Sequence, residues 1–376
     1  MKKISIAMVC EDLSPEMGGQ AISIPLLGEH LEEIGVTVRY FSGIHYRNQS
    51  SAQNYGRHFY FRYFHKRLKW SFGLFFQLWQ CRNDIDIVHI NNLWNFVPIT
   101  AYFFAKIVGI PYVVSTRGML IAEFVDKSRL KKILLRLIFK RILQEASFLH
   151  VTSEGEVESI EAYKLSSTIV KIGHGVKKII PEPDFFVFNE LRAKKRYILF
   201  SGRVCRYKNV GKLIKAFSIF SKSEPHWSLY IVGEIEDEEY FSELIKIIDS
   251  KNMSKKVNFF GHKKQSELAS FYTGASIFAN VSNSENFGLS IGEALSYGIP
   301  CIVPENSPWG DVEISNVGQR VSPDVPIISQ SLKKISSNLL DDENVFHKAI
   351  LSVDNLSWES QANKIYQFYV SILSGK

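Results

Sequence analysis

The sequence has few cysteines and no long apolar run. Its 376 residues include four cysteines, and none of them forms a CxxC pair. This scarcity argues against a zinc cluster and is typical of a protein from a reducing cytosol. No apolar stretch approaches the roughly 18 residues that a membrane-spanning helix needs. The sequence therefore predicts a globular cytoplasmic protein without a transmembrane segment.

Several other signals are missing as well. Two lysines open the chain, but acidic residues follow and no small-residue cleavage site does, so residues 1–16 predict a first strand rather than a signal peptide. No internal repeat and no low-complexity tract occurs. A GxGxxG frame is also absent, which leaves Gly18 and Gly19, after the first predicted strand, as a weak candidate for a phosphate-binding loop.

The pattern that is present is an alternation of short β-branched runs with helical stretches. In the first half the runs include "ISIAMV", "IDIVHI" and "YVVST", and in the second half "YILFSG", "SLYIVG" and "PCIVP". Strands that alternate with helices predict parallel sheets covered on both faces. The length allows two domains. We therefore expect an α/β fold with two Rossmann-like, doubly wound domains that face a central cleft.

Composition shifts suggest where these domains end. Residues 174–196 contain two prolines, mixed charge and little periodicity, which is typical of a linker. We expect an N-terminal domain over 1–175, a linker over 176–195 and a C-terminal domain over 196–357. Residues 358–376 have helical spacing and are expected to pack back toward the N-terminal domain.

Two loops of the C-terminal half concentrate the charged residues that would bind a ligand. Arg203, Arg206 and Lys208 lie between a predicted strand and a helix that begins near Val210. Cations beside helix-end amides suit an anion such as a diphosphate, although three solvated loop cations would give the same pattern.

The second loop contains Glu285 and leads into a short helix that contains Glu293. On one continuous helix these carboxylates would lie about 12 Å apart along the axis. That distance exceeds the roughly 5 to 9.5 Å of carboxylates that act together on one bond. The spacing suits contacts with two parts of one long ligand.

The order of these motifs resembles the retaining glycosyltransferases of family 4, which have the GT-B fold. Gly202-Arg203 with Lys208 five positions later is followed by "IVGE", by E-x7-E within "SENFGLSIGEALSYGIPCIV" and by "SPWGDV". In the first half, "DIVHINNLWNF" and "YVVSTRGML" resemble the bacterial members that build O-antigen, capsule or exopolysaccharide.

The resemblance implies a role for each matching residue. Arg203 and Lys208 would contact the donor diphosphate and stabilise the departing nucleotide. Glu285 would contact the donor sugar, and Glu293 would hold the ribose hydroxyls. The sugar pocket would be completed by the backbone amides of Asn286, Phe287, Gly288 and Leu289. The expected donor is a nucleoside diphosphate sugar, with no separate cofactor.

Some positions depart from the family pattern. Arg117 stands where many relatives have a histidine near the reacting carbon. Because an arginine stays charged and is no neutral base, we expect Arg117 to act by holding a donor or acceptor phosphate. His89 and Asn91 cover the family's HxH-like strand end without the second histidine, and a lone histidine there is more often structural. Asp84-Ile85-Asp86 matches a metal-binding DxD but precedes a strand, so we expect no essential metal.

The basic excess lies entirely in the first half. Residues 1–180 contain 23 Lys and Arg against 15 Asp and Glu. Residues 127–143 have the pattern of a basic amphipathic helix, and residues 57–70 add five cations interleaved with six aromatics. An ordinary sheet-covering helix with a solvated face explains the apolar stripe equally well. Basic and aromatic residues together suit an anionic membrane surface, here through residues 57–70 and 127–141.

Together these features predict a metal-independent retaining glycosyltransferase, peripheral on the inner face of the cytoplasmic membrane. The resemblance implies a polyprenyl-diphosphate-linked saccharide as acceptor and a role in cell-surface polysaccharide synthesis. The alternative is a non-catalytic protein that binds nucleic acid or membrane through its basic face. No nucleic-acid recognition module supports a nucleic-acid partner.

Overall fold

The computed structural model describes residues 3–14, 18–45, 57–63, 68–120, 133–165, 167–177, 196–283, 285–339 and 344–375. The chain divides into two compact units. Unit 1 comprises Met1–Gly175 together with Trp358–Lys376, and unit 2 comprises Val176–Ser357. The expected linker lies largely outside the described residues, which resume at 196.

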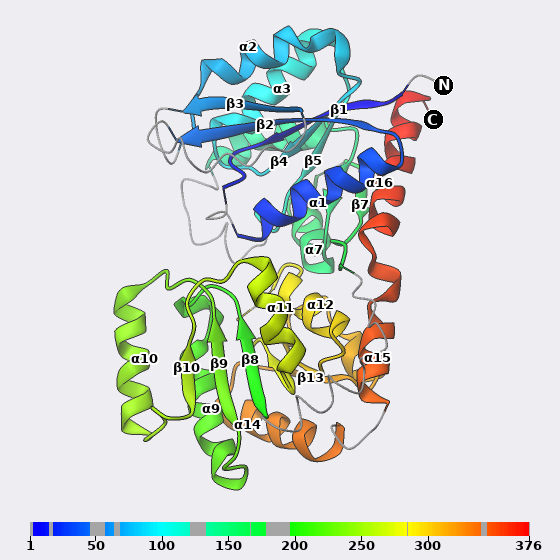
Figure 1. The fold of residues 1–376 in the computed structure, drawn as a ribbon. Coiled ribbons are helices and arrows are strands. Elements are labelled where there is room, and N and C mark those ends of the chain that lie inside the picture. Colours follow the sequence, from blue (N-terminus) through cyan, green and yellow to red (C-terminus); the bar gives the residue numbers. More distant parts are fainter. Residues whose placement is uncertain are drawn as a thin grey trace. The chain divides into compact units, whose positions relative to one another are not determined.

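The described part of unit 1 forms a seven-stranded parallel sheet in the order β3-β2-β1-β4-β5-β6-β7 (Figure 1). Its strands are β1 (Ser5–Cys10), β2 (Thr37–His45), β3 (Arg57–Tyr63), β4 (Ile87–Asn91), β5 (Tyr112–Ser115), β6 (Leu149–Val151) and β7 (Ile169–Lys171). Its helices include α1 (Gly19–Glu33), α2 (Phe72–Gln80), α3 (Phe96–Val108), α6 (Lys140–Gln144), α7 (Glu154–Ala162) and α16 (Trp358–Leu373).

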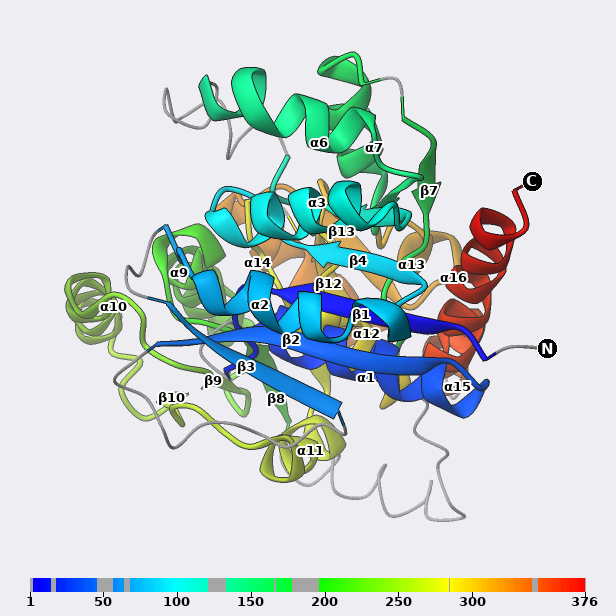
Figure 2. The same ribbon diagram turned by 90° about the horizontal axis from the view of Figure 1, so that it is seen from above.

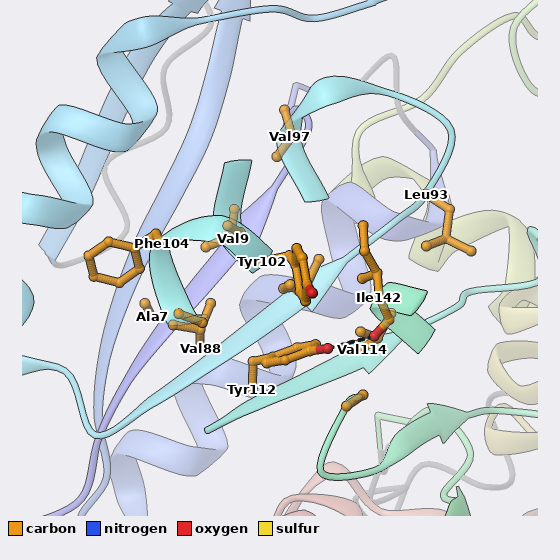
Figure 3. Packing of buried hydrophobic residues seen from close by; sticks show 14 of the residues in the cluster. Ala7, Val9, Val88, Leu93, Val97, Tyr102, Phe104, Tyr112, Val114 and Ile142 are labelled. Carbon is orange, nitrogen blue, oxygen red and sulfur yellow. Dashed lines mark hydrogen bonds between the residues drawn. The ribbon is translucent and has the colours of Figure 1, made fainter. Parts of the chain in front are cut away.

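The central strands β1, β4 and β5 are buried on both faces, which explains why they are largely apolar. Along β1, Ala7 and Val9 face a core with α2, α3 and α6, part of which is shown in Figure 3. Ile6 and Met8 face the opposite core with α1 and α16. The terminal helix α16 thus completes one face of unit 1, beside α1 (Figures 1 and 2).

The described part of unit 2 forms a six-stranded parallel sheet in the order β10-β9-β8-β11-β12-β13. Its strands are β8 (Tyr197–Ser201), β9 (Ser228–Val232), β10 (Val257–Phe259), β11 (Ile277–Ala279), β12 (Cys301–Pro304) and β13 (Gly318–Val321). The helices are α9 (Val210–Ser223), α10 (Glu238–Ser250), α11 (Gln265–Gly274), α12 (Leu289–Ser296), α13 (Asp311–Ile314), α14 (Val325–Lys334) and α15 (Val345–Ser352). The expected fold class of two doubly wound α/β sheets is confirmed.

The prediction that residues 57–70 present a basic aromatic surface is only partly correct. Arg57, Arg62 and Trp70 are exposed as expected. Residues 57–63 form the edge strand β3, and Phe61 and Tyr63 are buried because alternate side chains point into the core. Lys69 is buried as well, and its ammonium lies 3.4 Å from the Glu11 carboxylate. Residues 64–67 lie outside the described residues.

The predicted apolar stripe of 127–143 is also only partly correct. Residues 121–132 lie outside the described residues, and Leu135–Phe139 form a π-helical turn. A π-turn contains more residues than an α-helical turn, so it shifts the side chains out of α-helical register. Ile142 is buried as expected, whereas Ile133 and Leu137 are exposed.

Candidate functional site

The two ligand-binding loops predicted in unit 2 follow neighbouring strands at the point where the sheet reverses its winding. β8 and β11 pair at the centre of the sheet. α9, which follows β8, packs on one face, and α12, which follows β11, packs on the other. In doubly wound sheets, ligands bind outside the carboxyl ends of such strands. Loops 202–209 and 280–288 both begin at this edge.

Asn209 joins the two loops. It has a φ of 53° at the start of α9, a left-handed conformation that asparagine tolerates better than most residues. Its Nδ2 donates to the Val281 carbonyl at 3.0 Å and to the Asn283 side-chain oxygen at 2.7 Å. The backbone N–H of Asn283 in turn donates to the Tyr207 carbonyl at 3.2 Å. The loops are therefore held as one framework.

A buried ion pair lies across this framework. The Lys208 Nζ donates to the Glu285 Oε1 at 2.5 Å, with side chains only 15% and 10% exposed. The same oxygen accepts hydrogen bonds from Asn280 Nδ2 and Ser282 Oγ, both at 2.8 Å. The structure thus brings together two residues 77 positions apart that the sequence assigned to one site.

These contacts determine the charge of Glu285. Burial alone raises the pKa of the Glu285 carboxyl, but the Lys208 charge and the hydrogen bonds from Lys208, Asn280 and Ser282 outweigh it. The net effect holds the pKa below its ordinary value. Glu285 is therefore a carboxylate at neutral pH, suited to stabilising positive charge and unsuited to donating a proton.

The two arginines of the first loop have different surroundings. The Arg203 Nη1 donates to both oxygens of Glu236, at 3.0 and 3.1 Å, and both side chains are about half exposed. Arg206 lies against α10, where its Nη2 contacts Glu243 at 2.7 Å and its Nε contacts Asp237 at 3.3 Å. In this structure α10 and its cap supply the counter-ions of Arg206, and the grouping of Arg206 with Arg203 and Lys208 around an anion stays a prediction.

Glu293 is held separately on α12. It accepts a hydrogen bond of 2.9 Å from the buried Tyr272 hydroxyl, and the Tyr272 ring stacks on Tyr297. Gly288 precedes the helix with a φ of 74°, and a Cβ there would lie 2.9 Å from the Ile291 side chain. Glycine is favoured here because another residue would be strained in this conformation and the end of the Ile291 side chain would have to move.

The predicted donor-binding amides lie between these two glutamates. Asn286, Phe287 and Gly288 form the end of the loop, and Leu289 begins α12. The Trp309 indole donates to the Phe287 carbonyl and so holds this end of the loop. First-turn amides have no intrahelical acceptor, so this end of α12 can donate to an anionic or hydroxylated ligand.

The remaining predicted site residues lie in unit 1. Gly18, with a φ of 67°, caps α1, which begins at Gly19. Arg117 follows β5, and its Nη1 donates to Ser23 of α1 at 3.1 Å. Its Nε and Nη2 donate to the Asn91 side-chain oxygen at 2.9 and 2.8 Å. The structure therefore connects Arg117 with the helix that follows the glycine pair.

Arg117 is a buried cation. Burial lowers the pKa of its guanidinium to about 10, so it remains charged at neutral pH. Its hydrogen-bond acceptors among the described residues, Asn91 and Ser23, are neutral. The Arg117 backbone has a φ of 48°, a left-handed conformation that costs energy for a residue other than glycine. This arrangement fixes Arg117 as a positioned positive charge.

His89 is part of a buried chain of hydrogen bonds. Ile172 offers only a carbonyl, so His150 Nε2 must donate to it at 2.9 Å. Ser115 then donates to His150 Nδ1 at 2.7 Å, and His89 Nε2 donates to Ser115 at 2.6 Å. The Tyr369 hydroxyl of α16 completes the chain by donating to His89 Nδ1 at 2.5 Å.

Burial lowers the pKa of His89 well below its ordinary value and that of His150 to about 4. Both rings are thus neutral at pH 7. His89 is completely buried, so the structural interpretation of this strand histidine is the better one.

The aspartates of the DxD match serve the fold. Asp86 accepts the Ser5 amide of β1 at 2.9 Å, and Asp84 pairs with Arg39 at 3.6 Å. Within the described ranges no group of three or more His, Cys, Asp or Glu side chains is arranged as a metal site. No helix among the described residues has the length and apolarity to span a bilayer.

Sequence reasoning missed the residues that support the charged ones. Asn280 and Ser282 bind Glu285, and Tyr272 binds Glu293, but none was predicted. Asn280, Ser282 and Glu285 follow β11 at short intervals, and this cluster of polar residues at a strand end was a usable signal. No such signal marks Tyr272, because it lies on a different element, α11, away from both predicted loops in the sequence.

Both units match known protein families. Residues 182–352 match the family "Glycosyl transferases group 1", and residues 18–171 match "Glycosyl transferase 4-like domain". The alpha-monoglucosyldiacylglycerol synthase of Acholeplasma laidlawii is 39% identical over 101 residues, which cover 27% of this chain and 25% of that protein. The chain spans about a quarter to a third of the length of the first curated relatives that it matches.

Longer similarities extend over more of the chain. The GDP-mannose:cellobiosyl-diphosphopolyprenol alpha-mannosyltransferase of Xanthomonas campestris is 25% identical over 227 residues, which cover 60% of this chain and 57% of that protein. Among solved structures, sucrose-phosphate synthase from Thermosynechococcus elongatus superimposes with a TM-score of 0.79 at 19% identity. That superposition covers 99% of this chain and 100% of the other, and it shows the GT-B fold. With both units matched by glycosyltransferase models and the fold shared throughout, this chain belongs to the family 4 type of glycosyltransferases.

Proposed function

We propose that this protein is a retaining, metal-independent glycosyltransferase. It transfers a sugar from a nucleoside diphosphate sugar to a lipid-linked saccharide, such as one carried on a polyprenyl diphosphate, in cell-surface polysaccharide synthesis. The protein works at the inner face of the cytoplasmic membrane and attaches to its anionic surface peripherally. The observation that carries the proposal is the buried Lys208–Glu285 pair at the winding reversal of unit 2.

The described contacts support a division of roles at the donor. Lys208 would share its ammonium between Glu285 and a donor phosphate, and Arg203 would exchange the exposed Glu236 carboxylate for phosphate oxygens. Two such cations stabilise the negative charge that develops on the leaving diphosphate, a task that a metal performs in other enzymes. Glu285 would stabilise the positive charge on the sugar, and Glu293, oriented by Tyr272, would accept from the ribose hydroxyls.

Retention of configuration fits a substitution on one face of the sugar. The bond from the anomeric carbon to the phosphate oxygen breaks through an oxocarbenium-like state, and the acceptor oxygen bonds to the same face. The acceptor's hydroxyl proton passes to the departing phosphate. The names of the Acholeplasma laidlawii synthase and the Xanthomonas campestris mannosyltransferase both describe alpha-linked products. Both names also include a lipid among the substrates or products, which supports a lipid-linked acceptor.

The first test is thermal unfolding with UDP, GDP, CMP and their sugar conjugates, each with and without EDTA. A ligand at about 100 times its dissociation constant adds roughly 2.7 kcal/mol, enough to raise the midpoint by several degrees. We expect one nucleotide family to stabilise the protein, EDTA to have no effect, and Glu293→Ala to abolish the shift. Glu243→Ala, at the exposed pair with Arg206, is the matched control and should preserve it.

Failure of every nucleotide to shift the midpoint would contradict the proposed donor site. A shift that EDTA removes would contradict metal independence alone.

A further inference from the structure

The outward surface of α2 is aromatic. Phe72, Phe76 and Trp79 are spaced by four and three residues, so they share one face of the helix, and all three are exposed. The opposite face buries Leu74 and Leu78 in the core. An exposed helix of a globular protein usually turns polar residues outward. This helix is apolar on both sides.

The neighbouring helix α3 continues this surface. α2 and α3 lie side by side on the same face of the sheet (Figures 1 and 2). Phe96, Phe103 and Ile107 are exposed at intervals of seven and four residues along α3. The Trp70 ring contacts both Phe72 and Phe96, with centroids 4.8 and 6.4 Å apart. The exposed rings of both helices therefore meet through Trp70.

Cations border these rings. The Arg82 guanidinium lies 4.9 Å from the centre of the Trp79 ring. At the end of α3, Lys106 and Arg141 both contact Glu145, at 3.0 and 2.7 Å, and so neutralise that carboxylate with charge to spare. Lys140 is exposed beside them. Residues 87–122 contain no aspartate or glutamate.

We propose that this surface inserts into an anionic lipid bilayer. The aromatic face is defined as Trp70, Phe72, Phe76, Trp79, Phe96 and Phe103. The inference rests on the proposed function, since an enzyme that acts on a lipid-linked acceptor must reach the membrane. It changes the expected contact: Phe61 and Tyr63 are buried in the edge strand β3, so α2 and α3 supply most of the aromatic groups, and Trp70 remains from the stretch 57–70.

Charge and composition favour lipid over a second copy of this chain. A contiguous exposed apolar surface of this kind marks an interaction site. Tryptophan and phenylalanine enter the acyl boundary while arginine and lysine contact anionic headgroups. Two copies that met through this face would bring their bordering cations together, which disfavours self-association.

The test is vesicle co-sedimentation of the full chain with phosphatidylcholine vesicles that either contain or lack phosphatidylglycerol. Phe72→Ser with Phe76→Ser should weaken binding to the anionic vesicles by about tenfold or more, because both side chains would leave the acyl boundary. The matched control is Ile314→Ser with Leu351→Ser, which removes two exposed apolar side chains from unit 2. The control should bind like wild type, and wild-type tryptophan emission should shift to the blue on binding.

Equal binding by the aromatic variant and wild type would overturn the proposal. So would a wild-type dimer, detected without vesicles, that the aromatic variant lacks. Nucleotide-induced thermal shifts measured on the same preparations report on the donor site separately. A protein that binds nucleotide but not vesicles would refute this inference and the proposed membrane attachment but not the donor site, and one that binds vesicles but no nucleotide would refute only the donor site.

Discussion

The Lys208–Glu285 pair makes a quantitative prediction about the stability of unit 2. Replacement of Glu285 by glutamine keeps the shape of the side chain and an oxygen that can accept from Asn280 and Ser282. It removes the negative charge, which leaves the Lys208 ammonium in a site where only 15% of the side chain reaches solvent. The variant isolates the charge of Glu285.

The expected loss follows from the burial of the pair. Removal of one partner from a fully buried ion pair costs about 3–5 kcal/mol of unfolding free energy. Because both side chains remain slightly exposed and the neutral hydrogen bonds survive, we expect about 2–3 kcal/mol for Glu285→Gln. A double-mutant cycle with Lys208→Met should give a coupling energy of about 1–3 kcal/mol.

The assay is urea unfolding at neutral pH, followed by tryptophan fluorescence. The control cycle uses Arg206→Met and Glu243→Gln, an exposed pair whose coupling should be much smaller because water and salt screen it. The pKa of Glu285 is lowered in the folded state, so its contribution is present above the unfolded value near 4.3 and disappears as the pH falls through the folded value. Equal coupling in the two cycles would refute the argument that this pair is a buried, charge-determining contact.

Three further outcomes follow from other contacts. Burial lowers the pKa of His89 and His150, so the unfolded chain binds more protons in acid than the folded chain does. The free energy of unfolding should therefore fall as the pH drops from about 6.5 toward 4. A free energy that stays constant over that range in a urea-unfolding series would contradict this prediction. Tyr369→Phe removes the hydroxyl that donates to His89 and should lower the free energy of unfolding by about 1–3 kcal/mol in the same urea assay, with nucleotide affinity unchanged. A loss of nucleotide affinity would point to a direct role of Tyr369 in binding. Tyr272→Phe removes the 2.9 Å hydrogen bond that orients the Glu293 carboxylate and should weaken nucleotide binding by roughly fivefold, with less effect on a deoxyribose analogue, as measured by calorimetry. Equal weakening for both ligands would exclude a role through the ribose.

Local patterns in the sequence predicted the framework of the donor site. The strand "YILFSG", the loop cations and a helix from Val210 correspond to β8, loop 202–209 and α9. The helix that contains Glu293 ends before Gly298, whose φ is 72°. These features depend on β-branched runs, glycine conformations and helix periodicity, all of which are set by near neighbours in the chain.

The resemblance placed Lys208 and Glu285 at one donor site, but local patterns did not predict which distant side chains contact each other directly. Lys208 and Glu285, Tyr272 and Glu293, and Tyr369 and His89 meet only because the sheet order brings their elements together.

The edge strand β3 was missed for a related reason. Its two arginines lie at exposed positions, and alternate aromatic side chains point into the core. In the sequence alone, this mixture of basic and aromatic residues looks like a membrane-binding surface, and only the pairing with β2 identifies it as a strand. The π-turn at Leu135–Phe139 likewise has no signal in a regular helical spacing.

The most direct test of the central claim is the release of nucleoside diphosphate from sugar donors in the presence of bacterial lipid extract. Wild type and Glu243→Gln should turn over the donor that stabilises the protein, in the presence of EDTA. Glu285→Gln should lose about 100-fold or more in turnover, because the charge that stabilises the transition state is gone. Turnover by Glu285→Gln at the wild-type rate would show that the ion pair of unit 2 is only structural and would contradict the proposed site.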